Sequence, residues 1–292
     1  MIWPALAAAR RRDAAARVPF LIAGREAGSV ARVDLWSLRA WPHWLTVTDE
    51  RVTLTASDRD AALAAVNIAL REQGLVRAWR DEPYAIVDLA DGERLASTER
   101  AAARFWGTLT LGAHATGYVA DLVGRPTHLW IARRSPHKAT DPGLLDNLIG
   151  GGVPDGQAPL DALVREGWEE AGLSPEQMTA CRAGRVMRLH RDLPEGLQRE
   201  DLHSFDLRLP RGLTPCNQDG EVATFECLPV ALALKRAASA EMTVDAALVT
   251  LDFALRHDLL APAQAAPLQA AMTALTLQGP TAGARLRGPE GS

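Results

Sequence analysis

The sequence contains no long hydrophobic run, and no stretch approaches the roughly 20 consecutive apolar residues that cross a bilayer. In residues 1–17 the arginines follow a short apolar run rather than precede it, which is not the pattern of a secretion signal. We therefore expect a soluble cytoplasmic protein with no membrane partner.

Cysteine and lysine are both scarce. Cys181, Cys216 and Cys227 are odd in number and lack metal-ligand spacing, so we expect reduced thiols rather than a disulfide framework. Lysine occurs only at Lys138 and Lys235, so arginine carries almost all the basic charge, which together with the many alanines is typical of a GC-rich bacterial genome. The net charge of −4 argues against a nucleic-acid partner.

The chain has 292 residues, of which 47% are hydrophobic, enough for two small domains. We predict an N-terminal α+β module over residues 1–107, a second domain over 108–260, and a partly disordered tail over 261–292. The tail is alanine-rich from Pro262 and ends in GPTAGARLRGPEGS.

The N-terminal part shows secondary-structure signals but no chemical motif. Residues 18–24, 27–31 and 51–55 read as strands. We expect a helix from a Ser57 cap to about Gln73, with Asp60 as capping-box partner, and a second helix from a Thr98 cap to Gly107. Its aromatic residues are expected in the core or an interface rather than stacked on a ligand; they are Trp36, Trp41, Trp44 and Trp79.

The most informative stretch is GGVPDGQAPLDALVREGWEEAGL, residues 151–173. Pro159 suits a first helical position, and Gly172 suits the end of a helix. Leu160, Leu163, Val164 and Ala171 recur at helical spacing and predict a buried side.

Three glutamates, Glu166, Glu169 and Glu170, fall at i, i+3 and i+4 on the other side of this helix. They repel one another, and the C-terminal end of a helix disfavours anions. A hard divalent cation bound by oxygen ligands would remove both penalties, whereas a plain solvated acidic face is the alternative interpretation.

Strands are expected on both sides of this stretch. Residues 111–119 and 127–132 read as strands, and 144–150 as the strand that precedes the helix. Basic residues before the helix, Arg133, Arg134 and Lys138, are candidates to bind a diphosphate, because guanidinium groups match phosphate oxygens. His114 and Asn147 are further candidate substrate ligands.

After the helix, Ser174 is expected to cap a short helix, and residues 185–189, 204–209 and 223–227 to form strands. Helices are predicted over 229–238 and 243–257. Glu221, at the end of an acidic turn, is the best candidate for a carboxylate that reaches a metal from outside the glutamate helix.

The spacing of Gly151, Arg165, Glu166, Glu169, Glu170, Gly172 and Leu173 resembles the Nudix box, the signature of hydrolases that act on diphosphates linked to another group. Two positions depart from that pattern. The family usually has Glu where Gln157 stands and a bulky aliphatic residue where Gly167 stands, so we expect Arg165 to have different partners.

The strings GAHATGYV, WIARRSPHKATDPGLLDNLIGGGV, DLHSFDLRLP, NQDGEVATF and ALVTLDFALRH resemble one Nudix branch, related to proteins associated with thiamine pyrophosphokinase. The resemblance implies an α/β/α sandwich with a mixed sheet, preceded by a characteristic N-terminal module. It also implies hydrolysis of thiamine diphosphate, or its oxo and oxy analogues, to the monophosphate. Separately, we expect a monomer or homodimer.

The family's roles carry over to matching positions. Glu166, Glu169 and Glu170 would bind Mg²⁺ or Mn²⁺, and Glu166 is also a candidate to activate water. Gly150 would offer a backbone carbonyl to the metal, and Arg165 would orient the glutamates.

Three other functions stay open. A hydrolase of nucleotide-linked diphosphates shares the box, and a ligand-binding protein that has lost catalysis is compatible with Gln157. An isopentenyl diphosphate isomerase shares the fold, but that family uses a cysteine before its box-like helix and this chain has none before Cys181.

Overall fold

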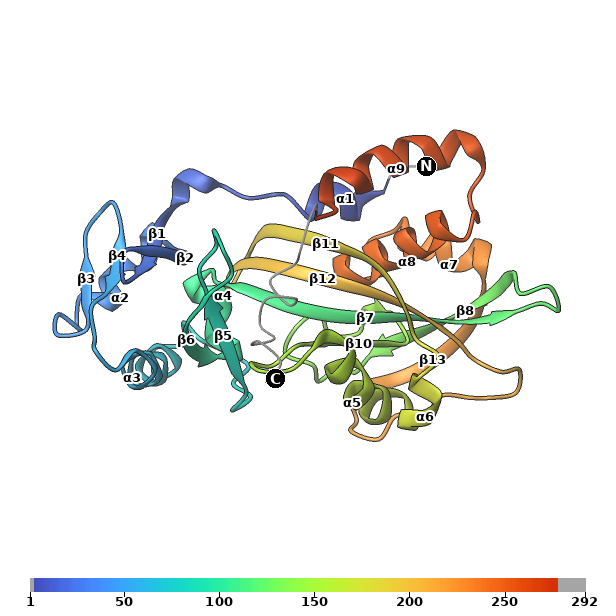
Figure 1. Ribbon diagram of the computed structural model, residues 1–292, viewed down its shortest axis with the longest axis horizontal. Coiled ribbons are helices and arrows are strands. Elements are labelled where there is room, and N and C mark those ends of the chain that lie inside the picture. Colours follow the sequence, from blue (N-terminus) through green and yellow to red (C-terminus); the bar gives the residue numbers. More distant parts are fainter. Residues whose placement is uncertain (1–2, 278–292) are drawn as a thin grey trace, which may run out of the picture.

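The computed structural model describes residues 3–277 and shows an α+β protein organised around one mixed seven-stranded sheet (Figure 1). The strand order is β11-β12-β7-β8-β13, with β10 paired to β7 and β9 paired to β8. Only β12 and β7 are parallel among these pairs. The strands are β7 (Leu109–Ala120), β8 (Pro126–Arg134), β9 (Leu145–Asp146), β10 (Ile149–Gly152), β11 (Arg182–Leu193), β12 (Gly196–Arg208) and β13 (Val222–Pro229).

Helices cover both faces of this sheet, so the expected α/β/α sandwich is confirmed (Figure 1). One face packs against α5 (Pro159–Ala171) and α6 (Pro175–Met178), through a core that includes Leu148, Leu163 and Leu207. The other face packs against α7 (Val230–Ala237), α8 (Val244–Arg256) and α9 (Pro262–Leu275). Two separate apolar cores thereby fix the sheet and the helices on its two faces.

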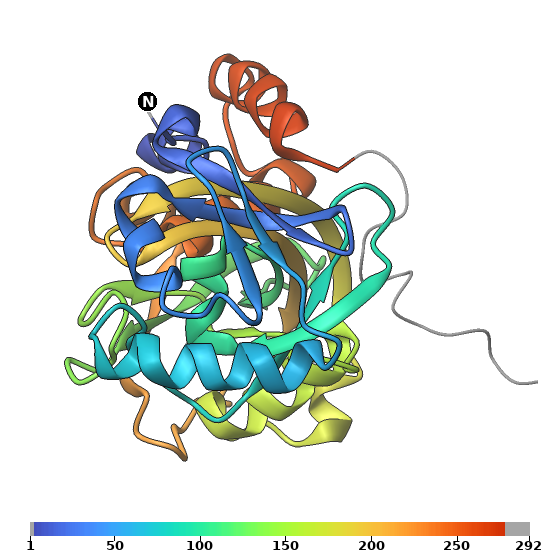
Figure 2. The same cartoon turned by 90° about the vertical axis from the view of Figure 1, so that its left-hand side faces the viewer.

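The N-terminal module has its own core, which includes the fully buried residues Phe20, Leu63 and Trp106. Figure 2 views the module end on, with α3 lying across it. A four-stranded sheet runs in the order β2-β1-β4-β3, and β5 and β6 form a separate hairpin. The elements are β1 (Arg17–Ile22), β2 (Arg25–Ala31), α2 (Leu35–Leu38), β3 (Leu45–Val47), β4 (Val52–Leu54), α3 (Arg59–Glu72), β5 (Pro83–Val87), β6 (Arg94–Glu99) and α4 (Ala103–Trp106).

Two predicted helix starts in this module are wrong. Asp58, not Ser57, caps α3, and the Asp60 carboxylate accepts from the backbone N–H of Ser97 instead of closing a capping box. Thr98 lies in β6, where its hydroxyl accepts from Asn67 of α3 at 2.8 Å. The pairing of β6 with β5 thus overrides a local capping signal.

The first residues pack on the main sheet rather than on the module. Helix α1 (Pro4–Ala8) contacts α8, and the carbonyl of Ala9 accepts from the N–H of His190 in β11 at 2.8 Å. The residues at the start of the chain therefore contact the second domain, although in sequence they precede the N-terminal module. The boundaries at 107/108 and 260/261 stay predictions.

Several second-domain elements differ in length from the expected ones. The predicted strand 144–150 is interrupted at Asn147 and Leu148, so β9 pairs with β8 while β10 pairs with β7. Strands β11 and β12 form a long hairpin, in which the extended segments 190–193 and 196–203 were not expected. The alanine-rich segment after Pro262 forms α9, whereas the predicted disorder over 279–292 lies outside the described residues.

The four tryptophans of the module differ in burial. Trp41, Trp44 and Trp79 pack against its core, whereas Trp36 is exposed. Across the described part of the chain, no helix is both long enough and apolar enough to cross a bilayer.

Candidate functional site

Both ends of helix α5 lie where the sequence predicts them. Pro159 occupies its first turn, and Gly172 ends it in the left-handed region at φ 66°. Leu163 and Ala171 are buried, but Leu160 is 42% exposed, so the buried side is narrower than predicted. The helix is turned so that the side with Glu166 and Glu170 is also buried, which leaves Leu160 toward solvent.

Glu166 and Glu170 are buried against β10 rather than exposed on an acidic face. The backbone N–H of Gly150 donates to Glu170 Oε2 at 2.9 Å. A Cβ on Gly151 would lie 2.6 Å from the carboxylate of Glu166. Glycines in β10 therefore let two carboxylates approach the strand closely, and the interpretation of a solvated face fails.

Burial makes both of these carboxylates hard to ionise. It raises the pKa of Glu166, with Arg165 opposing the shift and Glu169 adding to it. Burial also raises the pKa of Glu170, to about 8, although Lys138 and the Gly150 N–H favour the anion. Two desolvated carboxylates side by side need a nearby positive charge to stay ionised at neutral pH.

Arg165 supplies part of that charge. It donates to Glu169 Oε2 at 2.8 Å and to Glu166 Oε1 at 2.9 Å. Its Nη2 also lies 3.8 Å from a carboxylate oxygen of Glu82, which belongs to the N-terminal module. Gln157 stands where the Nudix box usually has Glu, and it is exposed and uncharged, so we expected Arg165 to have a different partner. Glu82 is that additional acidic partner.

Gly167 makes room for α6. A Cβ there would lie 2.7 Å from Met178 Sδ, whereas Trp168 is 54% exposed. The glycine therefore serves helix–helix packing rather than Trp168 or a strand, and its cost in helix propensity, about 1 kcal/mol, is offset by that contact.

Lys138 lies between two carboxylates. Its Nζ is 3.6 Å from Glu170 Oε1 and forms a hydrogen bond to Glu221 Oε2. Glu221 also accepts from Arg80 of the module at 2.8 Å. Burial alone would raise the pKa of Glu221, but Lys138 and Arg80 outweigh it and lower the pKa to about 2. In this structure Glu221 is thus engaged by two cations, and its predicted role as a metal ligand stays a proposal.

Of the three basic residues predicted to bind a diphosphate, only Arg134 and Lys138 face the same cavity. Arg134 forms an ion pair with Asp146 at 2.7 Å and faces the same cavity as Lys138. Arg133 donates to the carbonyl of Gly143 and does not line that cavity. Neighbouring residues of a strand point to opposite faces, which explains why Arg133 and Arg134 separate.

His114 and Asn147 meet, although they are 33 residues apart. His114 Nδ1 lies 3.1 Å from Asn147 Oδ1, and the Asn147 amide donates to Thr250 Oγ1 at 3.2 Å. His114 lines the cavity, whereas Asn147 is buried and does not. Asn147 therefore holds His114 in place instead of facing a ligand.

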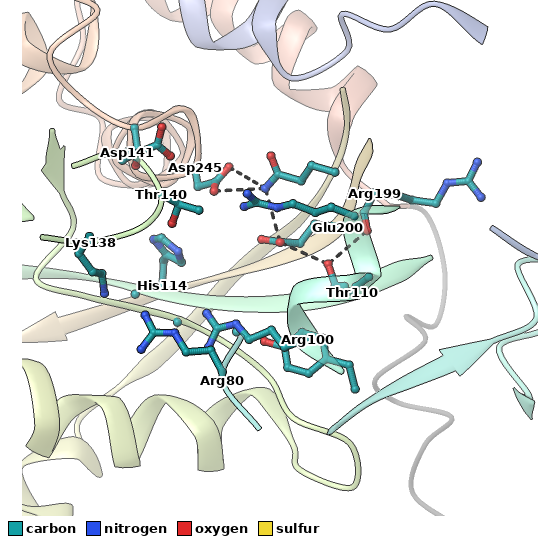
Figure 3. Close-up of a pocket in the computed structure, with 18 of the residues that line it drawn as sticks. Arg80, Arg100, Thr110, His114, Lys138, Thr140, Asp141, Arg199, Glu200 and Asp245 are labelled. Carbon is teal, nitrogen blue, oxygen red and sulfur yellow. Dashed lines mark hydrogen bonds between the residues drawn. The ribbon is translucent and has the colours of Figure 1, made fainter. Parts of the chain in front are cut away.

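A cavity of about 140 Å³ lies where the module meets the sheet (Figure 3). Lys138, Arg134 and Gly150–Gly152 border it, and Arg80, Tyr84 and Arg100 of the module close it. The three glutamates of α5 do not line it. Glu170 nevertheless lies next to the cavity, because Lys138 and Gly150 of β10 both contact Glu170 and both line the cavity.

Sequence reasoning missed Tyr84, Arg100 and Glu200 as lining residues. A side chain at Gly152 would overlap the Tyr84 hydroxyl, and one at Gly112 would collide with the Glu200 carboxylate. Glycine inside a strand often marks such a close approach. Gly112 and Gly152 were therefore available signals that a side chain from elsewhere lies over each strand.

Buried carboxylate oxygens of α5 are the candidate ligands for a divalent cation. Hard cations take oxygen ligands, and Glu166 and Glu170 offer buried carboxylate oxygens whose charge burial disfavours. Within residues 3–277, however, no group of three or more His, Cys, Asp or Glu side chains is gathered for a metal. Glu169 is turned to Arg165. The carboxylates of Glu166 and Glu170 fit Mg²⁺ or Mn²⁺ in chemistry, and Glu169 would have to release Arg165 in order to join them.

Comparison with known proteins agrees with this geometry. The family model described as NUDIX domain matches residues 114–247, which include β10, α5 and Glu221. Residues 114–247 form a Nudix domain. A model described only as a domain of unknown function matches residues 4–110, so the predicted link of the N-terminal module to thiamine pyrophosphokinase is not shown.

Curated relatives carry the same domain. Nudix hydrolase 20, chloroplastic, of Arabidopsis thaliana is 38% identical over 209 residues, 70% of this chain and 54% of the relative. Nudix hydrolase 24, chloroplastic, of the same plant is 36% identical over 70% of this chain and 56% of the relative. The chain thus spans about half the length of the curated relatives it matches.

Among solved structures, that of DR0079 from Deinococcus radiodurans resembles this Nudix domain at 24% identity and a TM-score of 0.42, over 56% of this chain and 92% of that one. The plant relatives do not support the bacterial origin suggested by composition.

Proposed function

We propose that this chain is a divalent-metal-dependent hydrolase of a diphosphate linkage, acting on thiamine diphosphate or its oxidised oxo and oxy analogues. The products would be the monophosphate and phosphate. The observation that carries the proposal is the burial of Glu166 and Glu170 against the glycine strand β10, with pKa values raised by burial. Carboxylates that serve only solubility are not placed there.

Glu166, Glu169 and Glu170 would hold Mg²⁺ or Mn²⁺, with the Gly150 carbonyl and Glu221 as further oxygen donors. When bound, the ion neutralises diphosphate oxygens and lowers the pKa of water. The reaction replaces the bridging P–O bond by a bond from the water oxygen to phosphorus, and the water proton passes to a base. Glu166 would suit that role in its ionised form, because burial raises the pKa of this carboxylate and so makes it a stronger proton acceptor.

The chain's cations would hold the remaining phosphate charge. Arg134 and Lys138 face the cavity from the Nudix domain, and Arg80 and Arg100 face it from the module. Arg165 would orient Glu166 and Glu169, to which it already donates. His114 would contact the substrate, held by Asn147.

A second candidate is a hydrolase of nucleotide-linked diphosphates. A cavity of about 780 Å³ adjoins the first one and shares Arg80, Arg100, Arg104 and Thr140 with it. That volume is within the range of small-molecule sites and has room for a nucleoside.

The deciding experiment is turnover with Mg²⁺ against thiamine diphosphate, its oxy analogue and ADP-ribose side by side. Phosphate release is followed by malachite green and the products by chromatography. Preference for the thiamine compounds supports the first proposal, and preference for ADP-ribose supports the second. Metal-dependent thermal stabilisation without hydrolysis of any compound would contradict both and favour a non-catalytic binding protein. A cytoplasmic location and a monomeric or homodimeric state remain predictions.

A further inference from the structure

An ion pair joins the N-terminal module to helix α5. Arg165 Nη2 lies 3.8 Å from Glu82 Oε1, while Arg165 donates to Glu169 at 2.8 Å and to Glu166 at 2.9 Å. A separation of 3.8 Å is within ion-pair range but is too long for a hydrogen bond. Glu82 is therefore a neighbouring carboxylate to which Arg165 is attracted without yet donating.

Glu82 has one oxygen available for Arg165. Its Oε2 accepts from Arg100 Nη1 at 2.7 Å, and its backbone carbonyl accepts from the N–H of Arg100 at 2.9 Å. Among residues 3–277, no hydrogen bond is formed to Oε1, the oxygen nearer to Arg165. Because a carboxylate accepts at both oxygens and a guanidinium has five donors, Arg165 can bind Oε1 while Arg100 keeps Oε2.

The segment that carries Glu82 has an unusual backbone that its neighbours fix. Asp81 lies in the left-handed region at φ 57°, and its carboxylate accepts from the indole N–H of Trp79 at 2.7 Å. The Glu99 carboxylate accepts from the N–H groups of Arg80 at 2.9 Å and of Glu82 at 3.1 Å. A left-handed residue other than glycine persists where surrounding contacts hold it. These contacts set the direction in which Glu82 leaves the chain.

The β5–β6 hairpin, which begins next to Glu82, is docked on the segment that precedes α5. The N–H of Asp155 donates to the carbonyl of Pro83 at 2.9 Å, and Arg94 donates to Asp155 Oδ2 at 2.7 Å. Glu82 therefore keeps its place beside α5 through contacts that do not involve Arg165.

Arg165 and Glu169 have to separate before the three glutamates of α5 can act together. Glu166 and Glu170 are buried, whereas the Glu169 carboxylate is held by Arg165. Breaking a charge-assisted hydrogen bond without a replacement is costly. Glu82 Oε1 offers the replacement after a movement of about 1 Å, from 3.8 Å to hydrogen-bond distance.

We propose that Glu82 is a positioning residue, which accepts Arg165 when Glu169 turns to a bound divalent cation. The N-terminal module thereby takes part in metal binding without touching the ion. This role rests on the proposed metal-dependent function, to which it adds a residue from outside the Nudix domain.

The test measures Mn²⁺ binding to the full chain after treatment with EDTA. The electron paramagnetic resonance signal of free Mn²⁺ gives the dissociation constant, and thermal melting without metal reports on folding. The variant is Glu82→Gln, which removes charge and keeps shape. Glu93→Gln is the matched control, because Glu93 also belongs to the β5–β6 hairpin and pairs with an arginine, Arg25, but its side chain is 65% exposed.

We expect Glu82→Gln to weaken Mn²⁺ binding about 10- to 100-fold, the range for residues that hold a metal ligand in place. Glu93→Gln should leave Mn²⁺ binding unchanged, and the melting temperature of Glu82→Gln should fall no further than that of Glu93→Gln. A crystal structure with Mn²⁺ should show Arg165 donating to Glu82 Oε1 at about 3 Å. Equal or tighter binding by Glu82→Gln, or an Mn²⁺-bound structure in which Arg165 still donates to Glu169, overturns the proposal.

Failure of the hydrolytic function would give a different result. The unmodified protein would then bind Mn²⁺, and Glu82→Gln would bind it more weakly, but neither would release phosphate from a diphosphate. That outcome supports the role of Glu82 and contradicts hydrolysis. Absence of Mn²⁺ binding by the unmodified protein would overturn both.

Discussion

Arg80 of the N-terminal module donates from Nη1 to Glu221 Oε1 of the Nudix domain at 2.8 Å. Glu221 is shared with Lys138, whose ammonium also lies 3.6 Å from Glu170. Two residues, Glu221 and Lys138, therefore connect Arg80 of the module to the Glu170 carboxylate of α5. This relationship makes the module part of the site and not only a neighbour of it.

Replacing Arg80 by alanine should raise the KM for a diphosphate about 3- to 10-fold, because one charged hydrogen bond near the phosphates is lost at a partly exposed position. Steady-state kinetics measures the change. Arg51→Ala, an exposed arginine in the β3–β4 turn, is the control and should leave KM unaltered. Equal KM values for Arg80→Ala and the unmodified protein would show that Arg80 does not bind the substrate.

Gly151→Ala should abolish metal-dependent activity, because its Cβ would lie 2.6 Å from the Glu166 carboxylate and displace it. Gly124→Ala provides the comparison, since its Cβ meets nothing within 4 Å, although its φ of 88° costs about 1 kcal/mol of stability. Turnover and thermal melting measured on both variants separate site damage from unfolding. Full activity of Gly151→Ala would mean that Glu166 is not needed where the structure places it.

Asp252→Ala should destabilise the fold by about 1–3 kcal/mol, because it removes a fully buried acceptor of hydrogen bonds from Ser204 and Arg256, although Arg256 keeps its bonds to Asp206. Asp252 is fully buried in α8, and its Oδ2 accepts from Ser204 at 2.6 Å and from Arg256 at 2.8 Å. Urea unfolding measures the loss. Asp49→Ala removes an exposed ion pair with Arg39 and should cost less than about 1 kcal/mol. Similar losses for both variants would contradict this assignment.

His190 should make stability depend on pH. Burial, followed by the charge of Arg199, lowers the pKa of His190 from 6.5 to about 3. Between those values the unfolded chain binds a proton that the folded chain does not, so the contribution is full above pH 6.5 and is lost as the pH falls toward 3. His190→Gln should flatten the decline of melting temperature over this window. An unchanged slope would show that His190 does not titrate on unfolding.

The sequence predicted the parts of the site that are local. Pro159, Gly172 and the spacing of the glutamates define α5 because capping and helical periodicity act within a few residues. It did not predict that Glu166 and Glu170 are buried, since that depends on β10 pairing with β7 across a long separation.

Contacts between segments that are distant in the sequence could not be predicted either. The Thr98 cap failed because β6 pairs with β5, and Asp58 took the place of Ser57 as the cap of α3. Glu82, Tyr84 and Glu200 come from segments without any motif. Tyr84 and Glu200 do leave a trace in the sequence, since Gly152 and Gly112, both inside strands, make room for them, whereas no such glycine marks Glu82.

The most direct test of the metal-dependent account is phosphate release from thiamine diphosphate with and without Mg²⁺, by the unmodified protein and by Glu169→Gln. Loss of a ligand should cost more than the roughly 10- to 100-fold typical of an outer-shell partner. The account predicts Mg²⁺-dependent release that disappears in Glu169→Gln while the melting temperature without metal is retained. Release that persists in Glu169→Gln, or that does not need Mg²⁺, would contradict it.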